Sequence, residues 1–132
     1  MVAWKTKTKY ENMDVVLIIS KDSEMVATWK ALFQQKNCQV ISETSASDAL
    51  QTANLLAPEL IILNLNLPES QQIDLCRELR LTTNGTLLLL APKEGKQKIS
   101  DYYHAGVNEH LTTPINPMTL LIKSMAWLVQ QQ

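Results

Sequence analysis

Glycine is scarce in this sequence, with only three glycines in 132 residues. Loops that wrap nucleotide phosphates need several glycines at close, fixed spacing, because the backbone must turn sharply and approach the phosphate. Gly85, Gly95 and Gly106 are each isolated, and the turn after the first apolar run, residues 19–23, contains none. The usual dinucleotide-binding and NTPase sites are therefore excluded.

Cysteine is just as rare. The two cysteines, Cys38 and Cys76, are far apart and form no Cys-x-x-Cys pair. A disulfide framework or a zinc site would need more ligands at closer spacing. We therefore expect reduced, partly buried thiols, and we expect neither a bound metal nor a cofactor.

Long apolar runs and a charge excess of one sign are also missing. The longest runs, residues 15–19 and 87–91, are too short to cross a bilayer. The 12 basic and 13 acidic residues give a net charge of −1, which does not favour nucleic acid or a membrane surface as a partner. The first residues lack the apolar run of a signal peptide, so we expect a cytoplasmic protein.

The length and composition are those of one globular domain, with 45% apolar and 19% charged residues. Residues 1–13 show no helical or strand period and predict a flexible N-terminal tail. Residues 14–129 predict the domain itself, and residues 130–132 predict a frayed C-terminus. The chain is either a stand-alone regulator or one domain of a longer protein.

From residue 14 onward, short apolar runs alternate with stretches whose apolar residues recur at helical spacing. Asp22 is placed to cap the first helix, and Asn116 followed by Pro117 opens the last one. Five strand–helix alternations imply an α/β fold, a parallel sheet with helices on both faces. The predicted strands are residues 15–19, 38–41, 60–63, 87–91 and 107–110, and the predicted helices are residues 23–36, 49–56, 71–82, 96–104 and 117–129.

Three segments resemble the receiver domain of two-component response regulators, the CheY-like family. Residues 60–68, LIILNLNLP, resemble the strand and loop that carry the family's phosphoacceptor aspartate, and residues 73–80 resemble the helix that follows. Residues 105–114, AGVNEHLTTP, resemble the family's Ala-Gly-Ala-x-x-Tyr-Leu-x-Lys-Pro segment. The resemblance covers about residues 14–129 and implies a flavodoxin-like (βα)5 three-layer sandwich, with the site at the carboxyl ends of the strands.

The chain departs from the family at the positions that carry its chemistry. The acidic pair after the first strand falls on Ser20 and Lys21, and the acceptor aspartate falls on Asn64. Asp22 lies one position beyond the acidic pair, where we expect a helix cap. The family's switch hydroxyl, switch aromatic residue and active-site lysine fall on Ala91, His110 and Thr113.

These substitutions remove the means of phosphoryl transfer that the resemblance would imply. The amide of Asn64 has neither the charge nor the nucleophilicity of a carboxylate. Magnesium prefers hard anionic oxygens, which Ser20, Lys21 and Asn64 do not supply. We therefore predict a pseudo-receiver without enzymatic activity, which acts in signal transduction as a phosphorylation-independent protein-interaction module.

The last predicted helix has an apolar stripe beyond its core-facing side. With Leu121 and Leu128 against the sheet, a second stripe at coiled-coil spacing remains for a partner. Receiver domains commonly associate through the fourth helix, fifth strand and fifth helix, so we expect a protein partner or a homodimer there. The residues expected on this face are Tyr102, His104, His110, Met118, Ile122, Met125 and Val129.

Two alternatives remain open from the sequence. The chain could be a phosphorylatable regulator of a phosphorelay with a displaced acceptor, in which Asp22 or Asp74 would serve. It could instead be a small-molecule sensor that uses the disused pocket, and an enclosed polar pocket at the strand ends would favour that reading.

Overall fold

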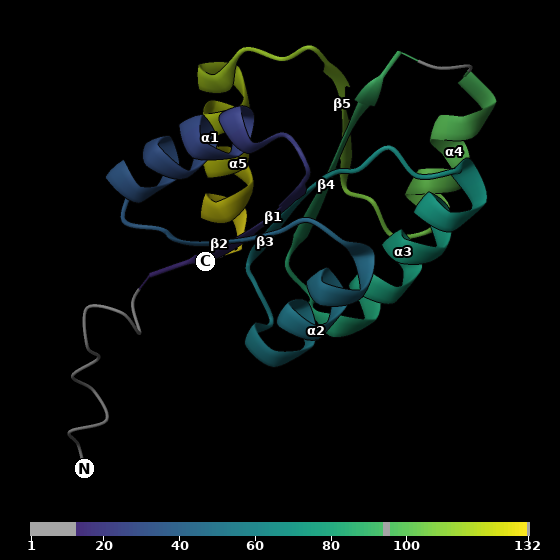
Figure 1. The fold of residues 1–132 in the computed structure, drawn as a ribbon, viewed down its shortest axis with the longest axis horizontal. Helices are drawn as coiled ribbons and strands as arrows, with labels where there is room; N and C mark the ends of the chain where they lie inside the picture. The colour runs from purple at the N-terminus through teal and green to yellow at the C-terminus, as the bar shows by residue number, and fades with distance from the viewer. Residues whose placement is uncertain (1–12, 94–95, 132) are drawn as a thin grey trace.

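The chain folds into one five-stranded sheet with helices on both faces (Figure 1). The computed structural model describes residues 13–93 and 96–131, so the predicted tail, residues 1–13, lies outside the described residues except for its last one. The strands are β1 (Val15–Ser20), β2 (Gln39–Glu43), β3 (Leu60–Asn64), β4 (Thr86–Pro92) and β5 (Glu109–Thr113), and the helices are α1 (Ser23–Gln35), α2 (Ala46–Leu56), α3 (Glu69–Thr82), α4 (Lys96–His104) and α5 (Pro117–Gln130).

The strands lie in the order β2-β1-β3-β4-β5, and every neighbouring pair is parallel. Helices α1 and α5 cover one face of the sheet, and α2, α3 and α4 cover the other (Figure 1). The expected flavodoxin-like three-layer sandwich is thus confirmed. None of the helices in the described part of the chain is long and apolar enough to span a bilayer.

The strands of this sheet are apolar on both faces because both faces are covered. Along β1, Val16 and Ile18 pack with Trp29 on the α1–α5 side, whereas Leu17 and Ile19 belong to the cluster on the α2–α4 side. All four strand residues are fully buried. Runs of adjacent apolar residues in the sequence therefore predicted buried strands such as β1, although they could not assign either face.

Side-chain caps begin three of the helices. Asp22 accepts a hydrogen bond from the backbone N–H of Met25 at 3.1 Å, and Ser45 accepts one from Asp48 at 3.2 Å. Asn116 accepts from the first turn of α5 at 2.8 Å. Each cap satisfies an N–H group that the helix itself leaves unpaired. The caps predicted at Asp22 and Asn116 are confirmed.

The last strand and the C-terminus differ from the prediction. The predicted strand 107–110 began too early, because the N–H of Val107 still bonds to the carbonyl of Tyr102 at 3.1 Å in the turn that ends α4. Strand β5 starts at Glu109. The expected frayed end is also corrected: α5 continues to Gln130, and the amide of Gln131 donates to Thr86 Oγ1 at 2.6 Å. Gln132 lies outside the described residues.

The side chain of Arg80, near the end of α3, binds the loops that precede β4 and β5. Its guanidinium donates to the carbonyl oxygens of Gly106 at 2.8 Å, Gly85 at 2.7 Å and Thr83 at 3.1 Å, and to Asn108 Oδ1 at 2.6 Å. Burial lowers the pKa of this guanidinium. Gly106 adopts a positive φ of 113°, and an added Cβ there would lie 2.8 Å from Arg80 Cγ. The planar fork of Arg80 thus joins the end of α3 to the segments that precede β4 and β5.

Candidate functional site

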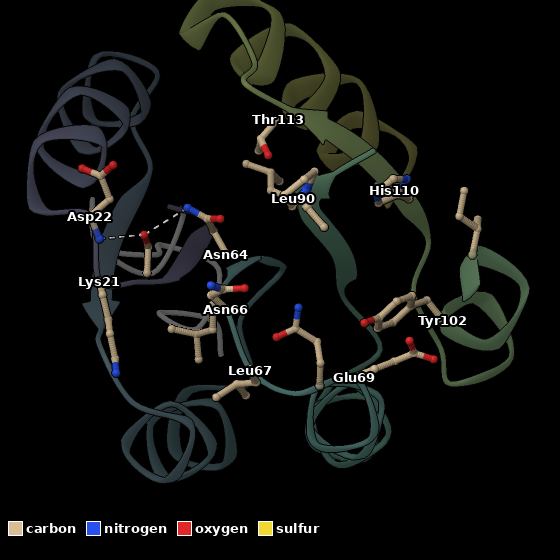
Figure 2. Close-up of a pocket in the computed structure, with 16 residues that line it drawn as sticks. Lys21, Asp22, Asn64, Asn66, Leu67, Glu69, Leu90, Tyr102, His110 and Thr113 are labelled. Atoms are coloured by element: carbon tan, nitrogen blue, oxygen red, sulfur yellow. Dashed lines mark hydrogen bonds between the residues drawn. The ribbon is translucent and has the colours of Figure 1, made fainter. Parts of the chain in front are cut away.

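A pocket of about 470 Å³ opens at the carboxyl ends of the strands. This is the edge at which parallel α/β sheets present their ligand sites. Its walls come from the loops after β1 and β3, the start of α3, the ends of β4 and β5, and α4 (Figure 2). The predicted site residues Ser20, Lys21, Asp22, Asn64, Ala91, His110 and Thr113 all line it.

The centre of the pocket holds a neutral amide–hydroxyl pair. Ser20 ends β1 and Asn64 ends β3, and the two are register partners in the parallel ladder. The Nδ2 atom of Asn64 donates a hydrogen bond to Ser20 Oγ at 3.2 Å (Figure 2). Ser20 Oγ also accepts from the backbone N–H of Asp22 at 3.1 Å. With only 2% of Ser20 exposed, this hydroxyl fixes the loop after β1 from inside.

The charged residues beside this pair are directed elsewhere. The carboxylate of Asp22 caps α1 through Met25 and points away from Asn64 in Figure 2. Lys21 is exposed, and its side chain extends away from Asn64 and Asn66. In this structure the Asp22 carboxylate therefore serves as the helix cap that the sequence predicted.

The opposite wall is formed by the ends of β4 and β5. Ala91 pairs with Thr112 and Pro92 pairs with Thr113, so the positions of the family's switch hydroxyl and lysine lie on neighbouring strands. A cis peptide bond joins Thr113 to Pro114 where β5 ends. The backbone N–H of His110 donates to the hydroxyl of Tyr103 at 3.0 Å, which links β5 to α4.

Several lining residues were not predicted from the sequence. Gln72 and Glu69 enter the pocket from α3, and Tyr102 and Ile99 enter it from α4. Tyr102 was expected on the outer interaction face, but it is half-buried and packs against the α2–α4 core. The i, i+3 spacing of Ile99 and Tyr102 was the available signal for a shared inner face. Gln72 gave no signal, because a polar residue at a helical position normally predicts exposure.

The donor set of this pocket does not fit a magnesium ion. Ser20 and Asn64 offer only neutral oxygens, and the carboxylate of Asp22 is engaged at the α1 cap. Glu69, the other carboxylate of the lining, lies beside Tyr102 (Figure 2). Octahedral magnesium usually binds through carboxylates as well as water. Within residues 13–93 and 96–131, no group of three or more His, Cys, Asp or Glu side chains could hold a metal ion.

The expected apolar stripe on α5 is largely open to solvent. Met118 is 50% exposed, and Ile122 and Val129 are each 65% exposed. Met125 differs, because it is half-buried and packs against the α1–α5 core. His104, at the end of α4, is exposed.

Glu109 ties this stripe to the sheet. One carboxylate oxygen of Glu109 accepts from Trp127 Nε1 at 2.8 Å, and the other pairs with Lys123 Nζ at 3.2 Å. Both partners lie on α5, one turn apart, so the helix is held against the first residue of β5. The exposed side chains of α5 therefore lie on a helix that Glu109 holds against β5.

Comparison with known proteins places the chain in a family. The sequence pattern of the response regulator receiver domain matches residues 16–124. The chain is similar to the aerobic respiration control protein ArcA of Escherichia coli, with 26% identity over 109 residues, or 83% of this chain and 46% of ArcA. It is 22% identical to the DNA-binding response regulator MtrA of Mycobacterium leprae over 113 residues, or 86% of this chain and 50% of MtrA. The chain spans about half the length of the curated relatives it matches.

Solved structures agree with this assignment at the level of the fold. A two-component response regulator from Clostridium difficile superposes with a TM-score of 0.82 at 21% identity, covering 91% of this chain and 99% of that chain. A CheY-like receiver domain protein from Methanospirillum hungatei superposes with a TM-score of 0.81 at 18% identity, covering 91% of this chain and 97% of that one. Since the family's sequence pattern extends over most of the domain and the sheet has the matching architecture, this chain belongs to the response regulator receiver domain family.

Proposed function

We propose that this receiver domain acts in signal transduction without being phosphorylated, as a non-enzymatic protein-interaction module of the cytoplasm. One observation carries the proposal. The residue at the acceptor position, Asn64, has an amide side chain that donates a hydrogen bond to the hydroxyl of Ser20. A receiver that accepts a phosphoryl group needs a carboxylate oxygen at that position, free to attack phosphorus.

The surroundings of Asn64 support the same conclusion. A phosphoryl group brings negative charge that a cation must stabilise. Lys21 is directed away from Asn64, and the family's lysine position holds Thr113. Ala91 has no hydroxyl with which to follow a phosphate. The family's acceptor, lysine and switch positions therefore hold none of the groups that this chemistry uses there.

The displaced-acceptor alternative is less well supported. Asp22 is engaged as the cap of α1, and losing that cap would destabilise the helix by about 1 kcal/mol. Asp74 lies on the exposed side of α3, where it pairs with Arg77 at 3.1 Å. It is not among the residues that line the pocket. Within the described part of the chain, neither carboxylate belongs to a group of three or more His, Cys, Asp or Glu side chains that could hold a metal ion.

A domain that does not switch by phosphorylation must act through a surface that is present all the time or is changed by a partner. The face formed by α4, β5 and α5 suits this role because its parts are joined by fixed contacts, Tyr103 to His110 and Trp127 to Glu109. Burying Ile122 or Val129 on a partner would return roughly 1.5–3 kcal/mol per side chain before association costs. We expect the partner to be a protein, and the first candidate to test is a second copy of this chain.

A phosphate analogue distinguishes this proposal from the displaced acceptor. Beryllofluoride with magnesium is added to the labelled protein, and the NMR signals of the Asn64 and Asn66 side-chain amides are followed. We expect no saturable shift below about 10 mM magnesium, because carboxylate-held sites bind far more tightly than that. Saturable shifts at these amides that disappear in Asp22→Ala would overturn the proposal in favour of a displaced site.

A further inference from the structure

One polar side chain in the pocket has no structural explanation. Gln72 lies on the buried side of α3 and is only 5% exposed. Its Oε1 atom has no hydrogen-bond partner among the described residues. A buried, unpaired carbonyl oxygen costs stability, and a leucine at this position would fill the same space without that cost. Gln72 also lines the pocket at the strand ends, so a group that enters the pocket is the natural candidate for its partner.

The middle of the pocket is polar but uncharged. Asn64 and Asn66 present their amide groups toward it in Figure 2, whereas Lys21 and Asp22 point away. Together with Gln72, three carboxamides therefore line this space. Carboxamides offer a donor and an acceptor side by side, which allows them to pair with the edge of a ring that carries the complementary groups.

Much of the remaining wall is apolar or aromatic. Leu67, Leu90 and Ile99 supply aliphatic surface, and Tyr102 supplies a ring. Glu69 is a carboxylate of the lining, and Figure 2 places it beside Tyr102. Apolar walls with a few convergent polar groups, in a volume of about 470 Å³, are typical of a site for a small organic molecule.

We infer that this pocket binds an uncharged planar ring carrying an exocyclic amino group, of the nucleobase class. The amino group donates to the carboxamide oxygens, Gln72 Oε1 among them, and the ring packs against Tyr102 and the aliphatic wall. Among the described side chains, Lys21 is directed away from the pocket, and no group of three or more His, Cys, Asp or Glu could hold a divalent cation. This inference rests on the proposed loss of phosphorylation, because the ligand takes the place of the phosphoryl group.

The pocket and the proposed interaction face share structural elements. Tyr102 lines the pocket from α4, and its neighbour Tyr103 accepts the hydrogen bond from His110 of β5. His110 also lines the pocket. A ring held against Tyr102 therefore touches the helix and strand whose outer sides form the interaction face. The NMR signal of the His110 backbone N–H therefore reports whether a ligand in the pocket affects the interaction face.

The test is an NMR titration of the whole chain with adenine and with cytosine. Purine, which has the ring of adenine without its amino group, is the matched control, and inorganic phosphate and acetate represent anionic ligands. Adenine or cytosine should give saturable shifts at the side-chain amides of Asn64, Asn66 and Gln72 and at the His110 amide. Purine should bind at least about tenfold more weakly than adenine, the effect of one lost hydrogen bond.

The inference is overturned if neither amino-bearing ring gives saturable shifts below about 1 mM, which corresponds to the weakest affinity worth calling a site. It is also overturned if purine binds as tightly as adenine, or if phosphate or acetate binds more tightly than both rings. If the rings do not bind and acetyl phosphate does not phosphorylate the chain, only the inference of ring binding is wrong. Phosphorylation by acetyl phosphate would remove the proposed function as well.

Two variants test the role of Gln72 against a purely structural one. Gln72→Leu should melt at the same temperature as the wild type or higher, because the unpaired oxygen is gone, yet bind adenine at least tenfold more weakly. Gln71→Leu, at the exposed neighbouring position, should leave binding unchanged. If Gln72→Leu does not fold, Asn66→Ala on the exposed loop provides the same readout. Wild-type affinity for adenine in the folded variant contradicts the inference.

Discussion

Asn64 and Ser20 are 44 residues apart in the sequence, yet the Asn64 amide donates a hydrogen bond to the Ser20 hydroxyl at 3.2 Å. The contact joins the last residue of β3 to the last residue of β1. In the receiver family these are the positions from which we expected the acceptor carboxylate and a metal-binding carboxylate. Here two neutral groups satisfy each other, which a pair of carboxylates could not do without a cation between them.

This pair can be measured by a double-mutant cycle. Ser20→Ala, Asn64→Ala and the combined variant are compared with the wild type by urea unfolding. We expect a coupling free energy of roughly 0.5–1.5 kcal/mol, the net contribution of a neutral hydrogen bond. A coupling free energy of zero would mean that the two side chains contribute to stability independently. The hydrogen bond between them would then not stabilise this arrangement of the pocket.

The guanidinium of Arg80 should be indispensable for stability. Arg80→Met leaves the carbonyl oxygens of Gly85 and Gly106 without their donor, and we expect a loss of about 2–4 kcal/mol in the free energy of unfolding. Arg80→Lys should not rescue it, because an ammonium group cannot reach several separate acceptors at once.

Arg77→Met is the matched control for Arg80, since Arg77 makes only an exposed pair with Asp74. We expect this control to change the free energy of unfolding by less than about 1 kcal/mol. Equal effects of the Arg77 and Arg80 variants would contradict the proposed role of Arg80.

Much of the fold was readable from the sequence because its signals are local. The apolar run at the start of β3 and the cap at Asp22 depend on residues close in sequence, and both predictions are confirmed. Strand β5 was placed too early because Val107 is apolar and buried, although it belongs to the turn after α4. Periodicity identifies burial, but it does not distinguish a buried turn from a strand.

The site was readable only in part. The resemblance to receiver domains brought Ser20, Asn64 and Thr113 to one expected edge, and the structure places all three around one pocket. Gln72 and the inward position of Tyr102 could not be predicted, because both depend on how α3 and α4 are rotated against the sheet. That rotation is fixed by packing between segments that are distant in the sequence.

The buried thiol of Cys76 should make stability fall at alkaline pH. Burial raises its pKa from the ordinary 9.0 to about 12. The unfolded chain therefore loses this proton above about pH 9 while the folded chain keeps it. The free energy of unfolding should fall by about 1.4 kcal/mol per pH unit for this thiol between those values.

Urea unfolding from pH 8 to 10.5 checks this, with Cys76→Ala to remove the contribution of the thiol. The variant starts from a lower stability because of its cavity, but its slope against pH should be shallower than that of the wild type. Parallel curves for the two proteins would show that Cys76 is accessible to solvent in the folded state.

The apolar stripe on α5 should support association. Ile122→Glu combined with Val129→Lys changes two side chains that are each 65% exposed, so the fold should remain intact while self-association is lost. Sedimentation velocity on the wild type and the variant is the measurement. Met125 is left unchanged because it packs against the core.

Leu81→Glu serves as the control for this prediction, because Leu81 is also an exposed apolar residue but lies at the end of α3. It should leave association unchanged. A wild type that stays monomeric up to about 1 mM would exclude a homodimer, since that concentration corresponds to only about 4 kcal/mol of binding free energy. A double variant that unfolds would show that these positions belong to the core.

Intact mass after incubation with acetyl phosphate and magnesium tests whether this receiver domain can carry a phosphoryl group. In a variant treated in parallel, Lys21→Asp restores one residue of the acidic pair, Asn64→Asp restores the acceptor, and Thr113→Lys restores the lysine. The expected result is an unchanged mass for the wild type and one added phosphoryl group for the restored variant. A wild-type chain that gains one phosphoryl group, lost in Asp22→Ala or Asp74→Ala, would contradict it.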